Sequence, residues 1–271
     1  MTDLGETEIK SIISIVREAK GIDFTDYAQS SLKRRIIRFF EMHNVSDTAE
    51  FRRRMSSDET FPGQFINEIT VNVTEMFRDP SFWTALKTIV VSGFKDLPVV
   101  NIWHAACSTG EEVVSMAIML KEAGLLHKCR ITASDLNMNA LNTARTSIYP
   151  LKRQELNSKN YEKAGGTEML SNYYTVNDKS VSYKEDLSAN TKFIYHDLSK
   201  EGTLGIFDII ICRNVFIYFN SNLQERVVDI FSRSLKKDSI LAIGSKESIS
   251  WNRAARNFNE LNFEEKIYKR I

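Results

Sequence analysis

The sequence predicts an α/β fold, in which a parallel sheet is covered by helices, preceded by a domain made only of helices. From residue 99 onward, short apolar runs alternate with segments of helical periodicity, which is typical of parallel strands joined by helices. Residues 1–80 show helical periodicity but no convincing strand. The chain has 271 residues, of which 42% are hydrophobic, so both parts can form a core. We therefore expect a helical domain over residues 1–80 and an α/β domain over 81–271.

The helical domain is predicted from two apolar stripes. Residues three or four positions apart lie on one face of a helix, so this spacing indicates an amphipathic helix. The first stripe consists of Ile9, Ile12, Ile13 and Val16, and the second of Leu32, Ile36, Phe39 and Phe40. Together they predict a small helical domain.

Five short apolar runs predict the strands of the α/β domain. They cover residues 99–105, 130–135, 193–195, 207–212 and 240–244, with helices near 111–123, 137–146 and 221–235. Between about 149 and 191 the alternation lapses into polar sequence with turn-forming pairs such as Gly165-Gly166 and Asn177-Asp178. We interpret that segment as a small inserted subdomain or hairpin.

The segment from Val99 to Glu112 indicates where a nucleoside would bind. A buried strand ends at Ala105, Gly110 allows a tight turn, and the first amides of the next helix face a ligand. Asp135 follows Gly110 near the ~20-residue offset at which an acid accepts from the hydroxyls of a bound ribose. The competing interpretation is that Asp135 caps the helix that begins near residue 137.

The expected nucleoside is poor in phosphate, because the sequence lacks both glycine-rich loops that bind pyrophosphate and triphosphate groups. S-adenosylmethionine has a ribose, an adenine, an ammonium and a sulfonium but no phosphate. Its positive charges suit acids such as Glu111, Glu112 and Asp135. The spacing alone leaves open other nucleosides and a plain α/β core, in which Glu111 and Glu112 only favour a helix N-terminus.

Composition bears on several other classes of protein. Lys and Arg total 36 against 35 acids, so the net charge does not attract nucleic acid or anionic lipid. No apolar run approaches ~20 residues and the N-terminus has no signal-peptide pattern, so we expect a cytoplasmic protein without membrane insertion. The scattered cysteines, Cys107, Cys129 and Cys212, predict buried thiols and neither a disulfide framework nor a metal site.

Three further polar segments follow predicted strands or join the two domains. Residues 72–80 lie between the domains, 196–198 follow the third predicted strand, and 212–219 complete and follow the fourth. In an open α/β sheet the ligand lies beyond the carboxyl ends of the strands. We therefore expect these segments to converge on the crevice that contains residues 104–112 and Asp135.

Four motifs, taken in order, resemble those of the CheR-type chemotaxis-receptor methyltransferases. They are N-x-T-x-x-F-R at 72–78, A-C-S-T-G-E-E at 106–112, A-S-D at 133–135 and C-R-N-V-x-I-Y-F at 212–219. The resemblance spans nearly the whole chain and implies a Rossmann-like, S-adenosylmethionine-dependent methyltransferase domain with a small inserted β-subdomain. It also implies methyl transfer to glutamates of chemoreceptor cytoplasmic helices in chemotaxis adaptation, giving glutamate methyl esters and S-adenosylhomocysteine.

The resemblance implies roles for individual residues. Asn72, Thr74 and Arg78 would bridge from the helical domain to the cofactor. Glu112 would contact the methionine part of the cofactor, and Asp135 would take its ribose hydroxyls. The remaining contacts, on the adenine side and beside the sulfonium, would come from Asp197, Leu198, Asn214 and Val215.

The implied reaction needs positioning more than acid–base chemistry. A glutamate carboxylate has a reference pKa of about 4.3, so it is already ionised near neutral pH and needs no general base. Its oxygen must be held roughly 3 to 3.5 Å from the methyl carbon. A guanidinium and a phenol can orient a carboxylate, and the catalytic candidates are Arg78 and Tyr218. The structural alternatives are a surface ion pair for Arg78 and a core aromatic for Tyr218.

The second predicted helix carries a local excess of positive charge in a nearly neutral chain. Arg34, Arg35 and Arg38 lie on one helical face, away from Leu32 and Ile36. In the family this region resembles the surface that meets acidic receptor helices, and we expect it to touch only the receptor and not the cofactor. A nucleic-acid patch and a solvated helix face are the alternatives, and the absence of interleaved aromatics argues against RNA.

Two departures from the family pattern bear on partners and affinity. Only the short stretch 175–183 separates Tyr173-Tyr174 from Lys184, where members that bind a receptor's C-terminal pentapeptide have a longer, glycine-rich turn. We therefore do not expect pentapeptide docking. Val113-Val114 stands where Pro-Tyr is usual, which removes an aromatic side chain near the cofactor.

Three functions are open at this point. The one that we favour is an S-adenosylmethionine-dependent protein-glutamate O-methyltransferase acting on chemoreceptors. The second is an interaction module of the same fold that binds the cofactor without catalysis. The third is a methyltransferase for nucleic acid or a small molecule. Two observations argue against it: the sequence has no extended basic surface and no N-P-P-Y-like loop.

Overall fold

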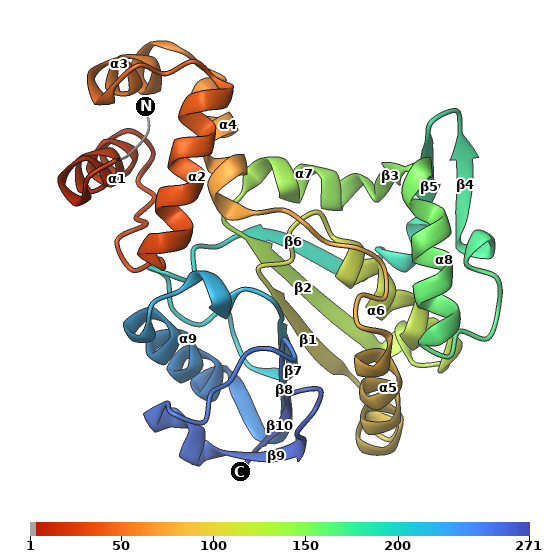
Figure 1. Cartoon of the computed structure of the whole chain (residues 1–271). Coiled ribbons are helices and arrows are strands. Elements are labelled where there is room, and N and C mark those ends of the chain that lie inside the picture. Colours follow the sequence, from red (N-terminus) through yellow and green to blue (C-terminus); the bar gives the residue numbers. More distant parts are fainter. Residues whose placement is uncertain (1–3) are drawn as a thin grey trace.

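The computed structural model describes residues 4–271. Its helical part lies on one side of the molecule (Figure 1) and consists of α1 (Glu6–Lys20), α2 (Gln29–Met42), α3 (Thr48–Ser57) and α4 (Phe61–Thr70). The two apolar stripes predicted from the sequence face the interior of this part, and all their members except Ile13 are fully buried. Four buried rings pack edge to face between the helices, namely Phe39, Phe51, Phe61 and Phe65. The predicted helical domain is thus present.

Within the described residues, the main sheet has the strand order β6-β2-β1-β7-β8-β10-β9. The strands are β1 (Val100–Ala105), β2 (Cys129–Asp135), β6 (Thr191–Tyr195), β7 (Phe207–Cys212), β8 (Leu235–Ile243), β9 (Phe258–Asn262) and β10 (Ile267–Arg270). The first five are parallel and match the five apolar runs of the sequence, with shifts of a few residues at their ends. These five predicted strands are confirmed.

The last two strands correct the expectation of a wholly parallel sheet. β9 and β10 form an antiparallel hairpin, and β10 pairs antiparallel with β8. The sheet is therefore mixed. The sequence gives little sign of β9 because most of its side chains are exposed, so it contains no apolar run.

β1 is the middle one of the five parallel strands and pairs with β2 on one side and β7 on the other. The chain therefore builds the sheet outward in two directions from β1. The point at which the strand order reverses direction is called the switch point, and here it lies between β1 and β7. Ligands of open α/β sheets bind at this point, beyond the carboxyl ends of the strands.

Helices cover both faces of the sheet (Figure 1). α5 (Pro80–Phe94) and α6 (Glu111–Glu122) share a core with Ile102 and Ile211. α9 (Ser221–Ser234) packs against the other face, where Trp103 and Ile210 belong to the same core as the N-terminal helices. Neighbouring residues of a strand point to opposite faces. Because both faces are covered, apolar side chains occur on both faces of β1 and β7.

A small antiparallel sheet lies within the segment predicted to be an insertion. Its strand order is β3-β5-β4, and it is accompanied by one further helix. The elements are α7 (Met138–Thr146), which precedes the sheet, and then β3 (Ile148–Pro150), α8 (Gln154–Lys163), β4 (Tyr174–Asn177) and β5 (Ser180–Tyr183). The subdomain predicted for 149–191 therefore exists as a three-stranded sheet.

The helical part is tied to the α/β part by main-chain contacts. Tyr27 and Phe219 form an isolated antiparallel bridge, and the N–H of Ala28 donates to the C=O of Tyr218 at 2.8 Å. The boundary near residue 80 stays a prediction. Across residues 4–271, no helix combines the length and the apolar character needed to cross a membrane.

Candidate functional site

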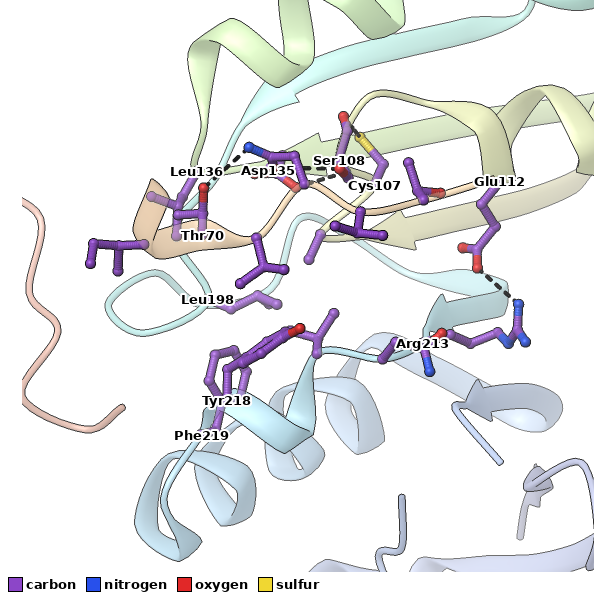
Figure 2. A pocket seen from close by; sticks show the side chains of 18 of the residues that line it. Thr70, Cys107, Ser108, Glu112, Asp135, Leu136, Leu198, Arg213, Tyr218 and Phe219 are labelled. Atoms are coloured by element: carbon purple, nitrogen blue, oxygen red, sulfur yellow. Dashed lines mark hydrogen bonds and ion pairs between the residues drawn. The ribbon is translucent and has the colours of Figure 1, made fainter. Parts of the chain in front are cut away.

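A pocket opens at the carboxyl ends of the central strands and is lined on another side by the connection that follows α4 (Figure 2). Its empty volume is about 1050 Å³, including the part open to solvent. All ten residues that the family resemblance assigned to the cofactor or to the reaction centre line it: Asn72, Thr74, Arg78, Glu112, Asp135, Asp197, Leu198, Asn214, Val215 and Tyr218. The lining does not include the predicted receptor-binding arginines. The structure thus brings the predicted site together, while the role of each residue stays a prediction.

The loop after β1 takes its shape from three residues with positive φ. These angles are 58° at Ala106, 52° at Ser108 and 91° at Gly110. Such angles favour glycine, but Gly110 has a second reason for lacking a side chain. A Cβ at this position would lie 2.8 Å from the Cβ of Ala144 in α7. Close approach of the loop to α7 therefore explains the glycine at the predicted turn.

The carboxylate of Asp135 joins the loops that follow β1 and β2. It accepts from the N–H of Ser108 and from the N–H of Asn137, both at 2.8 Å. Burial raises the pKa of Asp135 from its ordinary value, although these amides act in the opposite direction. Asn137, not Asp135, caps α7, because its side chain accepts from the amides of Asn139 and Ala140. Interpreting Asp135 as the cap of this helix is therefore wrong, and its carboxylate keeps further lone pairs toward the pocket.

Glu112 takes part in an ionic network that the sequence did not reveal. One of its carboxylate oxygens lies 3.0 Å from Nδ1 of His104. The other lies 3.3 Å from Nη1 of Arg213 (Figure 2). The Arg213 side chain is 1% exposed and contacts the Asp79 carboxylate at 2.7 Å. Burial alone would raise the pKa of Glu112, but the hydrogen bond and charge of His104 and the charge of Arg213 lower it. Glu112 is thus held as a carboxylate facing the pocket.

One sequence signal could have identified Arg213: it is a charged residue that directly follows the fully buried strand β7. Glu111 differs from its neighbour Glu112, because it does not line the pocket. It is 3% exposed and accepts from the hydroxyl of Thr109 at 2.6 Å. Successive side chains of a helix point about 100° apart, so only one of the two acids faces a ligand in the pocket.

Arg78 and Tyr218 line the pocket from two different segments, Arg78 from the connection after α4 and Tyr218 from the turn after β7. Nη1 of Arg78 donates to the C=O of Val73 at 3.3 Å, and Arg78 forms no ion pair with an acid of the described chain. Tyr218 lies in a short turn after β7, and its ring centroid is 5.4 Å from the guanidinium carbon of Arg35. Arg78 thus differs from the surface ion pair of its structural alternative. Tyr218 also packs against the core shared with the N-terminal helices, so its role stays a prediction.

Arg35 departs from the sequence prediction. We expected it on an exposed face of α2 together with Arg34 and Arg38, in contact with the receptor alone. Arg34 and Arg38 are exposed, but Arg35 is partly buried and its Nη1 donates to the C=O of Glu68 at 3.3 Å. The bridge between the two parts of the chain brings this side of α2 against Tyr218. Arg35 therefore does not share the exposed face of Arg34 and Arg38, while the contact of α2 with the receptor stays a prediction.

The pocket lining also includes a second buried acid. Asp197 is 3% exposed and accepts from the N–H and the hydroxyl of Ser199 at 2.9 and 2.6 Å. The lining also includes residues that were not predicted, among them Tyr27, Thr70, Leu136 and Phe219. Tyr27 and Thr70 belong to the helical part, and their place in the pocket depends on docking between the two parts, which leaves no signal in the sequence.

The cysteines do not form a further centre. Cys107, Cys129 and Cys212 are free and buried, and residues 4–271 contain no group of three or more His, Cys, Asp or Glu side chains placed to hold a metal ion. Burial raises the pKa of the Cys107 and Cys212 thiols, which disfavours their reactive thiolate forms.

Two family profiles together match almost the whole chain. The profile described as "CheR methyltransferase, all-alpha domain" matches residues 7–70, and "CheR methyltransferase, SAM binding domain" matches residues 72–267. The chain belongs to the CheR methyltransferase family. As a CheR methyltransferase it binds S-adenosylmethionine and uses it as the methyl donor.

Relatives of this CheR methyltransferase align over most of their lengths. A Pseudomonas putida protein named Cher3 is 33% identical over 98% of this chain and 97% of its own. The chemotaxis protein methyltransferase of Listeria monocytogenes is 30% identical over 87% of each chain. That of Salmonella typhimurium is 28% identical over 91% of this chain and 85% of its own.

The pocket of this CheR methyltransferase suits S-adenosylmethionine by its chemistry. The ionised Glu112 lies at one end and the apolar side chains of Leu136 and Leu198 lie at the other (Figure 2). An ammonium needs the first and a nucleoside base the second. The buried acceptor Asp135 lines the pocket as well. The residues present therefore fit the cofactor that the family binds.

Proposed function

We propose that this CheR methyltransferase acts in chemotaxis adaptation, transferring methyl groups to glutamate carboxylates of chemoreceptor cytoplasmic helices. The names of the Listeria and Salmonella relatives support a chemotactic role. The observation that carries the proposal is that a guanidinium, Arg78, and a phenol, Tyr218, line the same pocket as Glu112 and Asp135. The products would be glutamate methyl esters and S-adenosylhomocysteine, formed on the cytoplasmic side of the membrane.

In this proposal the pocket divides into a charged and a nucleoside end. Glu112 binds the ammonium of the cofactor, because its network with His104 and Arg213 lowers its pKa and keeps it ionised. Asp135 accepts from the ribose hydroxyls with the lone pairs that its two amide partners leave. The remaining cofactor contacts are those expected from the sequence: Asn72, Thr74, Arg78, Asp197, Leu198, Asn214 and Val215.

S-adenosylmethionine supplies a methyl group attached to a positively charged sulfur. Arg78 and Tyr218 orient the glutamate carboxylate toward that group, and no residue has to remove a proton, because the carboxylate is ionised near neutral pH. A guanidinium that bound the carboxylate too tightly would stabilise the ground state as well as the transition state. We therefore assign part of the orientation to the Tyr218 hydroxyl.

The receptor would dock on the exposed part of α2. Arg34 and Arg38 are exposed, and Arg38 Nε lies 3.1 Å from the Glu68 carboxylate, an acid that an incoming receptor acid would replace. Docking of a C-terminal pentapeptide is not part of the proposal. The β4–β5 hairpin turns through only Asp178 and Lys179. This turn is shorter than the glycine-rich turn of family members that bind the pentapeptide.

The test is methyl transfer from labelled S-adenosylmethionine to receptor cytoplasmic fragments. The expected label is lost in base, as a methyl ester is, and is absent from fragments whose target glutamates are changed to alanine. Binding of S-adenosylhomocysteine is measured by calorimetry on the same preparation. Tight binding without any transfer to receptor fragments would contradict the proposal in favour of a cofactor-binding interaction module. Base-stable label in RNA or DNA would instead indicate a nucleic-acid methyltransferase.

A further inference from the structure

Glu247 is a buried acid outside the pocket, in the turn that follows β8. It is 5% exposed, and no ion pair joins it to a basic side chain of residues 4–271. A buried carboxylate without a cation is costly unless hydrogen bonds satisfy it. The partners of Glu247 are therefore informative about what the residue does.

Backbone amides, rather than side chains, satisfy this carboxylate. Oε2 accepts from the N–H of Asn214 at 3.0 Å and from the N–H of Gly244 at 2.6 Å, and Oε1 accepts from the N–H of Ile217 at 3.4 Å. The turn leaves no room for a side chain at Gly244, because a Cβ there would lie 2.8 Å from Oε2 of Glu247 and 3.0 Å from the N of Asn214. The turn and the carboxylate are built to approach this backbone.

The two amides beyond the turn belong to the loop that carries the reaction centre. Asn214 and Val215 line the pocket, and Tyr218 follows Ile217 directly. Asn214 has a φ of 61°, a conformation that an asparagine adopts at some cost. An internal anion that collects amides pointing in one direction can hold such a backbone, as bound anions do in other proteins.

We propose that Glu247 is a positioning residue for methyl transfer, which fixes the backbone of residues 214–218 and thereby the place of Tyr218. The expected effect on kcat rests on the proposed function, whereas the expected effect on the backbone of the loop does not. Glu247 does not line the pocket. In this proposal it does not contact the substrate and acts only through the backbone of the loop.

Three variants test the proposal. Glu247→Ala removes all three acceptor contacts. Glu247→Gln keeps one oxygen for Asn214 and Gly244 but presents an amide group to Ile217. Asp208→Asn is the matched control, because Asp208 is 3% exposed and accepts from the N–H of Asn101 at 2.8 Å near the amino end of β7. It too weakens a buried carboxylate on this sheet, but at the end away from the pocket.

The expected result separates kcat from cofactor binding. A misplaced catalytic group costs about 100-fold, and we expect a fall of that order in kcat for Glu247→Ala. Glu247→Gln should lower kcat by about tenfold or less, since one hydrogen bond is lost. The Kd for S-adenosylhomocysteine should change by less than about threefold in both variants, and Asp208→Asn should leave kcat unchanged. A kcat loss in Asp208→Asn equal to that in the Glu247 variants would overturn the proposal.

Hydrogen exchange of the peptide spanning residues 212–220 supplies a readout that does not depend on activity. Exchange should be faster in both Glu247 variants than in the wild type, and unchanged in Asp208→Asn. Unchanged exchange in the Glu247 variants would overturn the proposal even if kcat fell. If the wild type transfers no methyl group to receptor, the proposed function fails, while exchange still decides whether Glu247 holds the loop. Glu247→Gln keeps the test available if the alanine variant does not fold.

Discussion

The Nη1 atom of Arg213 lies 3.3 Å from Oε2 of Glu112, at the point where β7 and α6 meet beside the pocket. The arginine directly follows β7 and the glutamate lies in the first turn of α6, so this pair links the loop after β7 to α6 beside the pocket. The Phe82 ring lies against the same guanidinium, 3.9 Å from its carbon to the ring centroid. The pair therefore combines electrostatic stabilisation with packing between β7, α6 and α5.

Removing Arg213 should cost stability. Arg213→Ala would leave Asp79 without its cation and Glu112 with His104 as its remaining partner, and breaking a buried pair from one side costs about 3–5 kcal/mol. Because Glu112 is 18% and Asp79 39% exposed, we expect the lower end, about 3 kcal/mol in the free energy of unfolding. Urea denaturation measures it. Arg233→Ala, which removes an exposed pair with Asp229 on α9, is the control and should cost less than about 0.5 kcal/mol. Equal losses in the two variants would contradict the prediction.

Cofactor affinity should depend on pH through Asp135. Burial raises the pKa of this carboxyl above its ordinary value of 3.8 in the ligand-free protein. Ribose hydroxyls donate to the ionised form, so binding favours loss of the proton. Affinity for S-adenosylhomocysteine should therefore rise as pH increases through the raised pKa, and level off above it.

The Asp135→Asn variant isolates this dependence. It keeps the size of the side chain but loses a charge-assisted hydrogen bond, so we expect Kd to increase about 10- to 100-fold. The rise of affinity with pH should also be smaller than in the wild type. Calorimetry at several pH values between about 4.5 and 8 measures both effects. An unchanged Kd at every pH would mean that Asp135 only joins the two loops.

Tyr218→Phe should separate catalysis from binding. The ring and its packing remain, and only the hydroxyl at the reaction centre is lost. We expect the Kd for S-adenosylhomocysteine to stay the same and kcat to fall, because the lost interaction is made in the transition state. Tyr195→Phe, which removes the hydroxyl of a tyrosine that does not line the pocket, is the control. A wild-type kcat in Tyr218→Phe would make Tyr218 a wall of the pocket and nothing more.

Charge reversal on α2 should affect the receptor alone. The double variant of Arg34→Glu and Arg38→Glu should raise the KM for receptor fragments and flatten its salt dependence, since exposed charges are screened over about 8 Å at physiological ionic strength. The Kd for S-adenosylhomocysteine should not move. Wild-type KM values at low and high salt would assign these arginines to a solvated helix face. Arg35 is left out of this variant because it lies against Tyr218.

The sequence was most informative where a residue's task depends on its own strand and loop. Buried parallel strands produce apolar runs, and ligands of open α/β sheets bind beyond the carboxyl ends of the strands. The sequence alone therefore placed Asp135 and Asn214 at one crevice, and both line the same pocket. The family motifs carried the same information in residue identities. Both sources describe local structure at the carboxyl ends of the strands.

The missed features depend on contacts between distant segments. Glu247 contacts the loop at Asn214 only because β8 lies beside β7, and the polar sequence around it contains no sign of that neighbour. The orientation of Arg35 follows from docking of the helical part onto the loop after β7, whereas helical periodicity cannot say which solvent-facing side chains a second domain will cover. β9 escaped detection because an edge strand with exposed side chains has no hydrophobic pattern.

The main-chain bridge between Tyr27 and Phe219 has a consequence for how the substrate is chosen. It fixes α2 relative to Tyr218, so the separation between the exposed arginines and the reaction centre is a constant of the fold. A receptor helix advances 1.5 Å per residue and turns about 100° with each one. Under the proposed function, this fixed separation selects the target residue by its distance along the receptor helix. An acid bound at α2 would determine which glutamate, a set number of residues away and on the same side, comes into line for methylation.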